Sequence, residues 1–269
     1  AQPSISLAIS EMEEYYGVKL FDRISRKLYL TENGRRALQY ARHIIDLLDE
    51  MEQGVRDVDA MGRLKVGTSI TIGTYLLPGY IKKLKQQYPA LKVEASIANS
   101  GTIEQQILDN DIDVGIIEGV AHSPFILSES FAGDRLVFIC PAGHEFAGKT
   151  LEELSEVRNQ DFILREKGSA GREIFDGILA AQELNVRPIW QSASNQVILQ
   201  GVKAGLGISI LPYFLVRQDI REGELAEFRI KDLALNRKYS VIYHKNKFLP
   251  RSARTLMELC KEGNGADRL

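Results

Sequence analysis

Small hydroxyl and amide side chains gather at four points where a predicted strand is followed by a predicted helix. The first N–H groups of a helix have no partner within that helix, so helix starts favour anions. Four such loops at one cleft would form a site for a small acid, such as a carboxylate, sulfate or sulfur metabolite. The alternative is that each loop merely caps its helix. The loops are Ser69-Ile70-Thr71, Asn99-Ser100-Gly101-Thr102, Gly168-Ser169-Ala170 and Ser192-Ala193-Ser194-Asn195.

One carboxylate lies near these loops in the predicted topology. Glu118 ends the apolar run from Val114, which predicts a buried strand. A carboxylate at that point could bind a basic group on an amino-acid-like ligand. It could equally pair with a nearby arginine such as Arg172.

Basic residues concentrate near the start of the chain. The net charge of the 269 residues is -2, which by itself argues against a nucleic-acid binder. From Gly17 to Arg42, however, seven Lys or Arg residues face only two acidic ones. A basic end on an acidic body fits a protein that places one face on phosphate, whereas the alternative is an ordinary charged surface. The predicted phosphate contacts are Arg23, Arg26, Lys27 and Arg35.

No set of residues in the chain predicts catalysis. The four histidines (43, 122, 144 and 244) lack metal-ligand spacing, and nucleophile-elbow, P-loop and dinucleotide motifs are missing. Cys140 and Cys260 are far apart and are expected in the core rather than in a disulfide or zinc site. We therefore expect no enzyme activity, metal or cofactor. Without a signal peptide or long apolar run, a cytoplasmic protein that is not inserted in a membrane is expected.

The first 34 residues predict a short helix followed by a β-hairpin. Pro3 suits a first helical turn, apolar residues recur down to Tyr16, and Gly17 ends the helix. Strand-like residues 21–24 and 28–30 flank a charged tip. A helix followed by a basic hairpin is typical of the recognition half of a winged helix-turn-helix. Its base-reading end would carry Gln2, Pro3, Ser4, Ser6 and Leu7.

A long helix is predicted from Glu32 to about Asp59, with Thr31 as its cap. Its apolar residues follow a strict heptad spacing, which predicts a dimer seam. Leu38, Ile45 and Leu47 widen the stripe, so a core helix in a globular domain is the alternative. The seam residues are Ala37, Ala41, Ile44, Leu48, Met51, Val55 and Val58.

After Gly62 the chain alternates predicted strands and helices, which is typical of an α/β domain with mostly parallel strands. Ligands bind outside the carboxyl ends of such strands. The predicted strands are 63–68, 92–98, 114–118, 135–140, 162–164, 187–191, 208–212 and 238–245. The predicted helices are 77–87, 102–110, 170–181, 195–204 and 250–262.

The start of the chain resembles the DNA-binding domain of the LysR-type transcriptional regulators. The matching residues keep the family's spacing without a gap, although family members begin about two helices earlier. From Ala1 onward we therefore expect a partial, N-terminally truncated winged helix-turn-helix that lacks packing partners for its recognition helix. The resemblance rests on Gln2, Pro3, Ser4, Ser6, Ile9, Glu13, Gly17, Val18, Leu20, Phe21, Arg23, Arg26, Leu30, Thr31 and Gly34.

The rest of the chain resembles the effector-binding domain of the same family, which is built like a periplasmic binding protein. The similarity rests on the phrases VGTSITIGTYLLP (66–78), DIDVGIIEG (111–119) and GVKAGLGISILP (201–212). It implies an effector bound between two lobes. The implied effector residues are Ser69, Thr71, Thr102 and Asn195, with Ser100, Ser169 and Glu118 behind them.

The resemblance implies a DNA-binding domain at 1–34, a linker and dimerisation helix at 35–61, and an effector domain at 62–269. The first lobe would span about 63–134 and 245–262, and the second about 135–244. The crossovers near Asp134-Arg135 and His244-Lys245 would form the hinge.

Four partners follow from the resemblance: double-stranded promoter DNA, a small and anionic effector, a second copy giving dimers or tetramers, and RNA polymerase. The first alternative is a small-molecule binding protein without a DNA role, which leaves the helix–hairpin string and the heptad seam unexplained. The second is an enzyme on a doubly wound scaffold.

Overall fold

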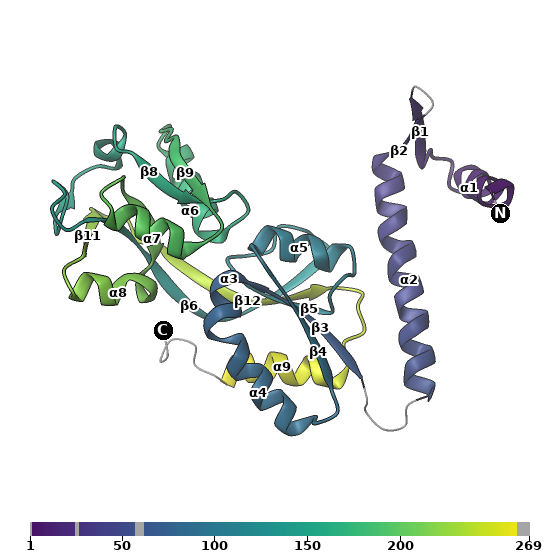
Figure 1. Cartoon of the computed structure of the whole chain (residues 1–269). Helices are drawn as coiled ribbons and strands as arrows, with labels where there is room; N and C mark the ends of the chain where they lie inside the picture. Colours follow the sequence, from purple (N-terminus) through teal and green to yellow (C-terminus); the bar gives the residue numbers. More distant parts are fainter. Residues whose placement is uncertain (1, 25–26, 57–61, 263–269) are drawn as a thin grey trace.

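In a computed structural model of the chain, the described residues are 2–24, 27–56 and 62–262, and they form three parts in chain order (Figure 1). The side chains of residues 2–4, 23, 49–50 and 52–56 are outside this description. A helix and hairpin come first, a long helix follows, and a two-lobed α/β body completes the chain.

The N-terminal part is helix α1 (Gln2–Tyr16) followed by the antiparallel pair β1 (Phe21–Ile24) and β2 (Lys27–Leu30). Gly17 has a φ of 66°, a conformation that glycine adopts without strain, and it ends α1. The Glu13 carboxylate accepts the N–H groups of Leu20 and Phe21, at 2.8 and 3.2 Å, and binds the Lys19 ammonium. These bonds lower the pKa of Glu13 to about 2, the bond from Lys19 having the largest effect. Helix and hairpin are thus held together by one carboxylate.

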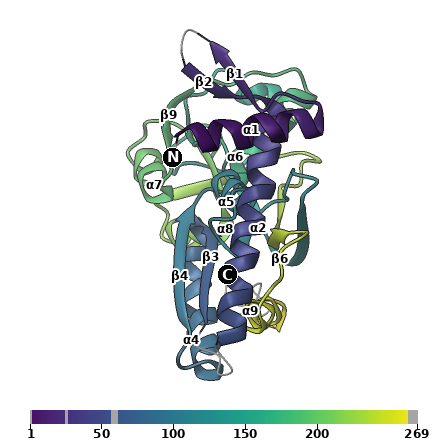
Figure 2. The same cartoon turned by 90° about the vertical axis from the view of Figure 1, so that its right-hand side faces the viewer.

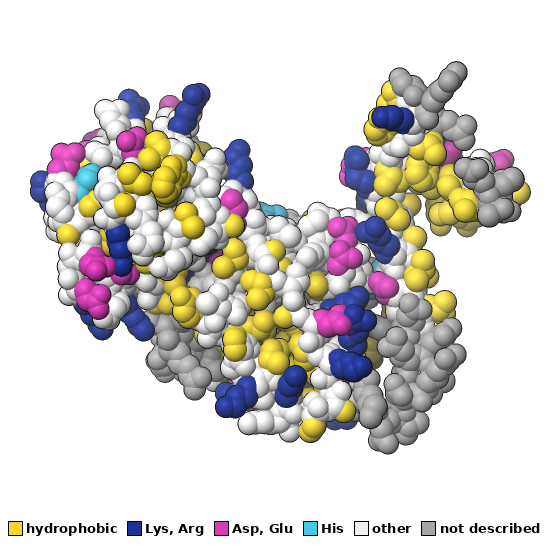
Figure 3. All heavy atoms as spheres, in the orientation of Figure 1, with side chains coloured by type: hydrophobic (Ala, Val, Ile, Leu, Met, Phe, Trp, Pro, Cys, Tyr) yellow, Lys and Arg dark blue, Asp and Glu magenta, His cyan; other side chains and the backbone are white. Residues whose placement is uncertain are grey.

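Helix α2 (Glu32–Arg56) forms a separate rod beside the α/β body (Figures 1 and 2). The predicted cap is confirmed, because the Thr31 hydroxyl accepts the N–H of Gly34 at 2.9 Å. Ile44, Leu48 and Met51 of the predicted seam are exposed. The side chain of Val55, and Val58 as a whole, lie outside the described residues. Figure 3 shows apolar side chains along the described part of α2.

One face of α2 contacts the α/β body. The His43 imidazole Nε2 lies 2.8 Å from the carbonyl oxygen of Asn246, and its ring centroid is 5.1 Å from that of His244. At the preceding residue, a guanidinium nitrogen of Arg42 is 3.7 Å from Asp109. The helix therefore touches the first lobe through its middle, while Ile44, Leu48 and Met51 of the seam stay exposed.

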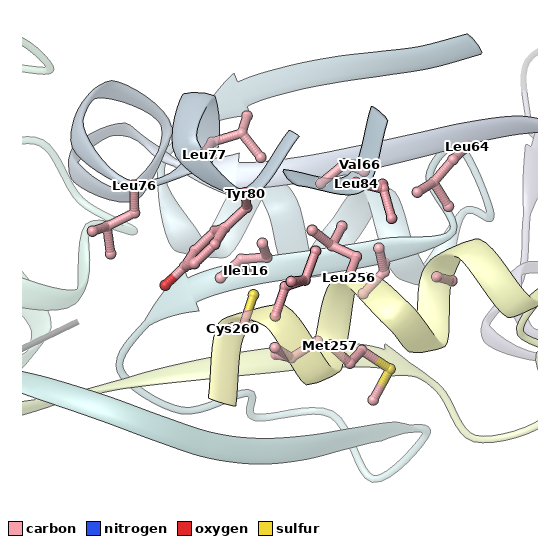
Figure 4. Packing of buried hydrophobic residues seen from close by; sticks show 14 of the residues in the cluster. Leu64, Val66, Leu76, Leu77, Tyr80, Leu84, Ile116, Leu256, Met257 and Cys260 are labelled. Carbon is pink, nitrogen blue, oxygen red and sulfur yellow. The ribbon is translucent and has the colours of Figure 1, made fainter. Parts of the chain in front are cut away.

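The first lobe is built on strands β4 (Lys92–Ala98), β3 (Arg63–Ser69) and β5 (Val114–Glu118), which are parallel and adjacent in that order. Helices α4 (Leu77–Gln87) and α9 (Arg251–Glu262) pack on one face and α5 (Ser100–Leu108) on the other. In Figure 4, Tyr80, Ile116, Leu256 and Cys260 meet between α4, α9 and the sheet. Because these apolar side chains are buried together, strands β3, β4 and β5 are held firmly, and so are the loops that follow their carboxyl ends.

The second lobe contains one end of an eight-stranded sheet that continues from the first lobe through β6, a separate two-stranded sheet and four helical segments. Strand β10 (Ser209–Pro212) and strand β11 (Leu225–Ile230) pair with the second half of β6 (Ile126–Pro141), and β7 (Thr150–Leu151) pairs with β11. Strands β8 (Phe162–Arg165) and β9 (Pro188–Ser192) are parallel. The helical segments are η1 (Leu154–Val157), α6 (Ala170–Ala181), α7 (Asn195–Lys203) and α8 (Tyr213–Arg221).

The predicted second crossover near His244 is wrong. Strand β12 (Asn236–His244) pairs with β5 through Tyr239–Ile242 and with the first half of β6. Residues 236–244 therefore lie in the first lobe, because Tyr239 and Val241 bury their side chains in its core. The chain returns at Leu235–Asn236, opposite Arg135 in the continuous strand β6.

Several elements were not predicted from the sequence: helix α3 (Ile70–Tyr75), the first half of β6, β7, η1, α8 and β11. The prediction that both cysteines are in the core is confirmed. Burial raises the pKa of the Cys140 thiol to about 11 and that of Cys260 to about 12.

Candidate functional site

The two lobes face each other at two places, a contact between two loops and a cavity between helices α3 and α7. On one side, the loop before α5 touches the loop before α6. The Gly101 N–H donates to the carbonyl oxygen of Gly168 at 3.0 Å, and the Asn99 amide donates to the carbonyl of Lys167 at 3.5 Å. Gly168 has a φ of 86°, which a side chain would strain. This side of the cleft is closed by direct contact.

The same side carries a histidine between carboxylates of both lobes. His122 Nδ1 is 3.2 Å from Glu104, and its Nε2 is 3.8 Å from Glu173 on α6. Burial, followed by the nearby carboxylates of Glu104 and Asp176, raises the pKa of Glu173, although His122 opposes this.

On the other side, α3 and α7 enclose a cavity of about 430 Å³. Tyr75 of α3 and Phe214 of α8 bridge the lobes there, with ring centroids 5.2 Å apart. The first lobe contributes Ile70 and Thr74 to the lining. The second lobe contributes polar residues from the start of α7 and apolar residues behind them, namely Ala193, Ser194, Asn195, Gln196, Leu199, Leu211, Leu215 and Val216. A cavity with an apolar wall and a few polar groups is typical of a small-molecule site.

Of the predicted effector residues, Asn195 lines this cavity, while Ser69 and Thr71 flank the cavity-lining Ile70 in the chain. Ser69 and Thr71 are 1% and 2% exposed, and neither hydroxyl has a hydrogen-bond partner among the described residues. Ser69 is the N-cap residue of α3 and yet its side chain makes no capping bond. Since buried polar groups are normally paired, these two hydroxyls are unusual.

The remaining predicted hydroxyls belong to the closed side of the cleft. The Ser100 hydroxyl donates to the Glu118 carbonyl at 2.9 Å. Ser169 caps α6 by accepting the Arg172 N–H at 3.3 Å, which is the helix-cap alternative. The side chain of Thr102 is exposed, and its N–H donates to Asn99 at 2.9 Å. These three residues are not part of the cavity lining.

The suggested pairing of Glu118 with Arg172 is wrong. Glu118 Oε2 lies 3.3 Å from Arg237, and Arg237 also donates to Asp134 at 2.8 Å. Burial alone would lower the pKa of Arg237, but the carboxylates of Glu118 and Asp134 raise it. The other oxygen of Glu118 is buried without a partner among the described residues. Strand order explains the difference, because β12 places Arg237 beside β5.

Two buried arginines at the second-lobe side were missed from the sequence. Arg172 donates to Asp176 at 2.7 Å and to the Arg165 carbonyl at 3.0 Å. Arg165, the last residue of β8, donates to Asn195 Oδ1 at 2.8 Å and to both oxygens of Glu166. An arginine at the carboxyl end of a predicted buried strand is the signal that could have indicated Arg165.

The predicted DNA-contacting residues that the structure describes lie on α1, the hairpin and the start of α2. Leu7 is 60% exposed and Lys27 is exposed, whereas Ser6 lines a groove of about 400 Å³ between α1 and β1. Arg35 donates to Glu32 at 2.8 Å and to the carbonyl of Leu30 at 3.4 Å. The side chains of Gln2, Pro3, Ser4 and Arg23, and Arg26 as a whole, lie outside the described residues.

Within the described ranges, none of the helices combines the length and apolar character that crossing a membrane requires.

Sequence families and known proteins agree with this architecture. Residues 59–265 match the family "LysR substrate binding domain", and residues 1–35 match "Bacterial regulatory helix-turn-helix protein, lysR family". The HTH-type transcriptional regulator YeiE of Escherichia coli (strain K12) is 34% identical over 266 residues, covering 98% of this chain and 89% of that protein. The HTH-type transcriptional regulator CysL of Bacillus subtilis (strain 168) is 29% identical over 245 residues, covering 90% and 82%.

Among solved structures, the regulatory domain of Synechocystis CcmR in complex with 2-PG has a TM-score of 0.68 and 24% identity. It covers 76% of this chain and 98% of that one. This likeness supports the two-lobed fold. With family matches over both the start and the greater part of the sequence, the chain belongs to the LysR family of transcriptional regulators.

Proposed function

We propose that a small anionic effector binds in the cavity between α3 and α7 and thereby modulates promoter binding by this LysR-type regulator. The observation that carries the proposal is the pair of buried hydroxyls of Ser69 and Thr71, which have no partner among the described residues. In the chain they flank Ile70, which lines the cavity together with Asn195. Leaving a buried hydroxyl unpaired costs about 1–3 kcal/mol, and a ligand oxygen would recover part of that cost. The CcmR regulatory domain, with the same fold, is bound to 2-PG.

The residues of the closed side would act less directly. Ser100, Thr102 and Ser169 border the contact between the Asn99–Thr102 and Lys167–Ala170 loops, so they would respond to a change in lobe closure. Glu118 would hold the hinge through Arg237. An effector that binds the closed arrangement more tightly would shift the protein toward it.

At the DNA end, the start of α1 would read base edges through Gln2, Pro3, Ser4, Ser6 and Leu7. The hairpin and the start of α2 would contact phosphates through Arg23, Arg26, Lys27 and Arg35. The excess of basic residues between Gly17 and Arg42 supports this assignment.

The exposed seam of α2 would pair with a second copy to give a homodimer that can associate further into a tetramer. Ile44, Leu48 and Met51 are 65%, 52% and 57% exposed, which is unusual for large apolar side chains spaced at heptad positions. Two copies would present two recognition helices to two half-sites. The dimer would act in the cytoplasm, where promoter DNA and RNA polymerase are present.

The effector proposal is tested by thermal denaturation of the full chain with sulfate, phosphate or 2-PG. Wild type should show a rise in Tm with at least one anion. Thr71→Val should lose that rise, whereas Thr255→Val on α9 should keep it. No rise in wild type, or an equal rise in both variants, would contradict the assigned site.

A further inference from the structure

Arg165 binds the cavity-lining residue Asn195, and each of its three side-chain nitrogens donates one hydrogen bond to a neighbouring side chain. The residue is 8% exposed at the end of β8. Nε and Nη2 donate to the two oxygens of Glu166 at 2.9 and 3.1 Å. Nη1 donates to Asn195 Oδ1 at 2.8 Å. Glu166 thus balances the charge of the guanidinium, and the remaining nitrogen holds Asn195.

The bond from Arg165 Nη1 to Asn195 determines which end of the Asn195 amide remains free to face a ligand. A guanidinium carries donors only, so the atom of Asn195 that faces it must be the carbonyl oxygen. The NH₂ group is then the remaining polar end of this half-buried, cavity-lining side chain. The end of the Asn195 side chain that is not bonded to Arg165 therefore offers two N–H donors to a ligand.

The surrounding groups on α7 share this preference. Ser194 already accepts the N–H of Val197 at 3.4 Å, and its own N–H donates to Ser192 at 3.0 Å. The rest of the second-lobe lining is largely apolar, with Leu199, Leu211 and Leu215. A ligand group placed against Asn195 must accept hydrogen bonds, as a carboxylate or oxyanion does.

We propose that Arg165 is a positioning residue that makes this wall of the cavity selective for a carboxylate or oxyanion group, without touching that group itself. The proposal rests on the function proposed above, since it specifies how the same cavity recognises its anion.

The sharpest test is Asn195→Asp. The new carboxylate keeps the bond from Arg165 and nearly the same shape, but it presents an acceptor in place of the NH₂ donor. An acidic residue in the first turn of a helix is favourable, so folding is retained. Sulfate and phosphate binding to the full chain should weaken about tenfold or more. Gln200→Glu adds the same charge to an exposed position of α7 outside the cavity and should change affinity by less than about twofold.

A second measurement does not depend on any ligand. The side-chain amide signals of Asn195 in a ¹⁵N NMR spectrum are those that disappear in Asn195→Asp. They should move in Arg165→Lys, because an ammonium cannot bind both oxygens of Glu166 and also hold Asn195 in place. Arg165→Lys should also weaken sulfate and phosphate binding.

The two proposals can fail separately. If Asn195→Asp binds sulfate and phosphate as tightly as wild type, or the Asn195 signals are unchanged in Arg165→Lys, the role of Arg165 is refuted. If neither anion binds wild type while the signals do move, Arg165 positions Asn195 as proposed but the anionic effector is refuted.

Discussion

The two lobes place a serine at the start of helices that border the cleft, and they use it differently. In the second lobe, Ser169 caps α6 and Ser194 caps α7 through side-chain bonds. In the first lobe, Ser69 occupies the same position before α3, and its hydroxyl makes no such bond. Thr71 nearby is likewise buried without a partner among the described residues. The same residue type thus caps a helix in one lobe and is left without a hydrogen bond to a described residue in the other.

This difference suggests that the two lobes would respond differently to an effector. The second-lobe wall is preorganised, because Arg165, Glu166 and Asn195 hold one another in place. Donors that are already held in place lose little conformational entropy when they bind a charged group. Next to the first-lobe wall, the buried hydroxyls of Ser69 and Thr71 have no partner among the described residues, although buried polar groups are normally paired. Effector entry would therefore change the first lobe more than the second.

The largest predicted effect comes from removing the partner of two buried carboxylates in the first lobe. Arg237→Met should lower the free energy of unfolding by about 3–5 kcal/mol, because it leaves Glu118 and Asp134 buried without their cation. Urea denaturation measures this. The matched control is Arg135→Met in the facing strand β6, whose half-exposed guanidinium pairs with Glu227 and whose loss should cost about 0–1 kcal/mol. Equal losses in the two variants would show that the Arg237 cluster is not a special support of the hinge.

The next prediction tests the serine comparison directly. Ser169→Ala removes the cap of α6 and should lower the free energy of unfolding by about 1 kcal/mol. Ser69→Ala removes a hydroxyl that has no bond to lose, so stability should stay the same or rise. Urea denaturation of both variants without added anions decides the matter. A loss of stability in Ser69→Ala as large as in Ser169→Ala would show that the two lobes use their serines alike.

The sequence predicted the local part of this comparison better than the long-range part. Helix α4 has the predicted bounds and the cap at Thr31 is confirmed, since such features depend on neighbouring residues. At Ser169, predicted as an effector residue, the structure shows the helix cap that was the alternative. The pairing of Glu118 with Arg237 could not be read, because it depends on which sheet β12 joins. The hydrophobic alternation of Tyr239 and Val241 predicts a strand but does not select its neighbours. The role of Arg165 was missed for the same reason, since Asn195 lies 30 residues further along.

The smallest predicted effect concerns the contact between α2 and the first lobe, where His43 lies against His244 and Asn246. The His244 pKa is lowered, first by burial and then by the charges of His43, Lys245 and Lys247. Lys247 itself is bound to Asp113 at 2.9 Å, and Phe125 stacks on His244. A histidine with a lowered pKa binds protons more readily when α2 is undocked. Docking is therefore fully stabilised above the ordinary value of 6.5 and weakens as the pH falls through the lowered pKa.

Hydrogen exchange of the amides in α2, compared between pH 7 and pH 5 after correction for the intrinsic rates, measures this release. Protection of residues around His43 should decrease at the lower pH, because protonated His244 would be a third cation next to Lys245 and Lys247 and would lie against His43 of α2. His244→Gln cannot gain that charge and should flatten the pH dependence. Protection in α6 of the second lobe, which is remote from this contact, should change little. A parallel loss of protection in α6 would mean that acid loosens the whole body and that the first lobe has no separate response.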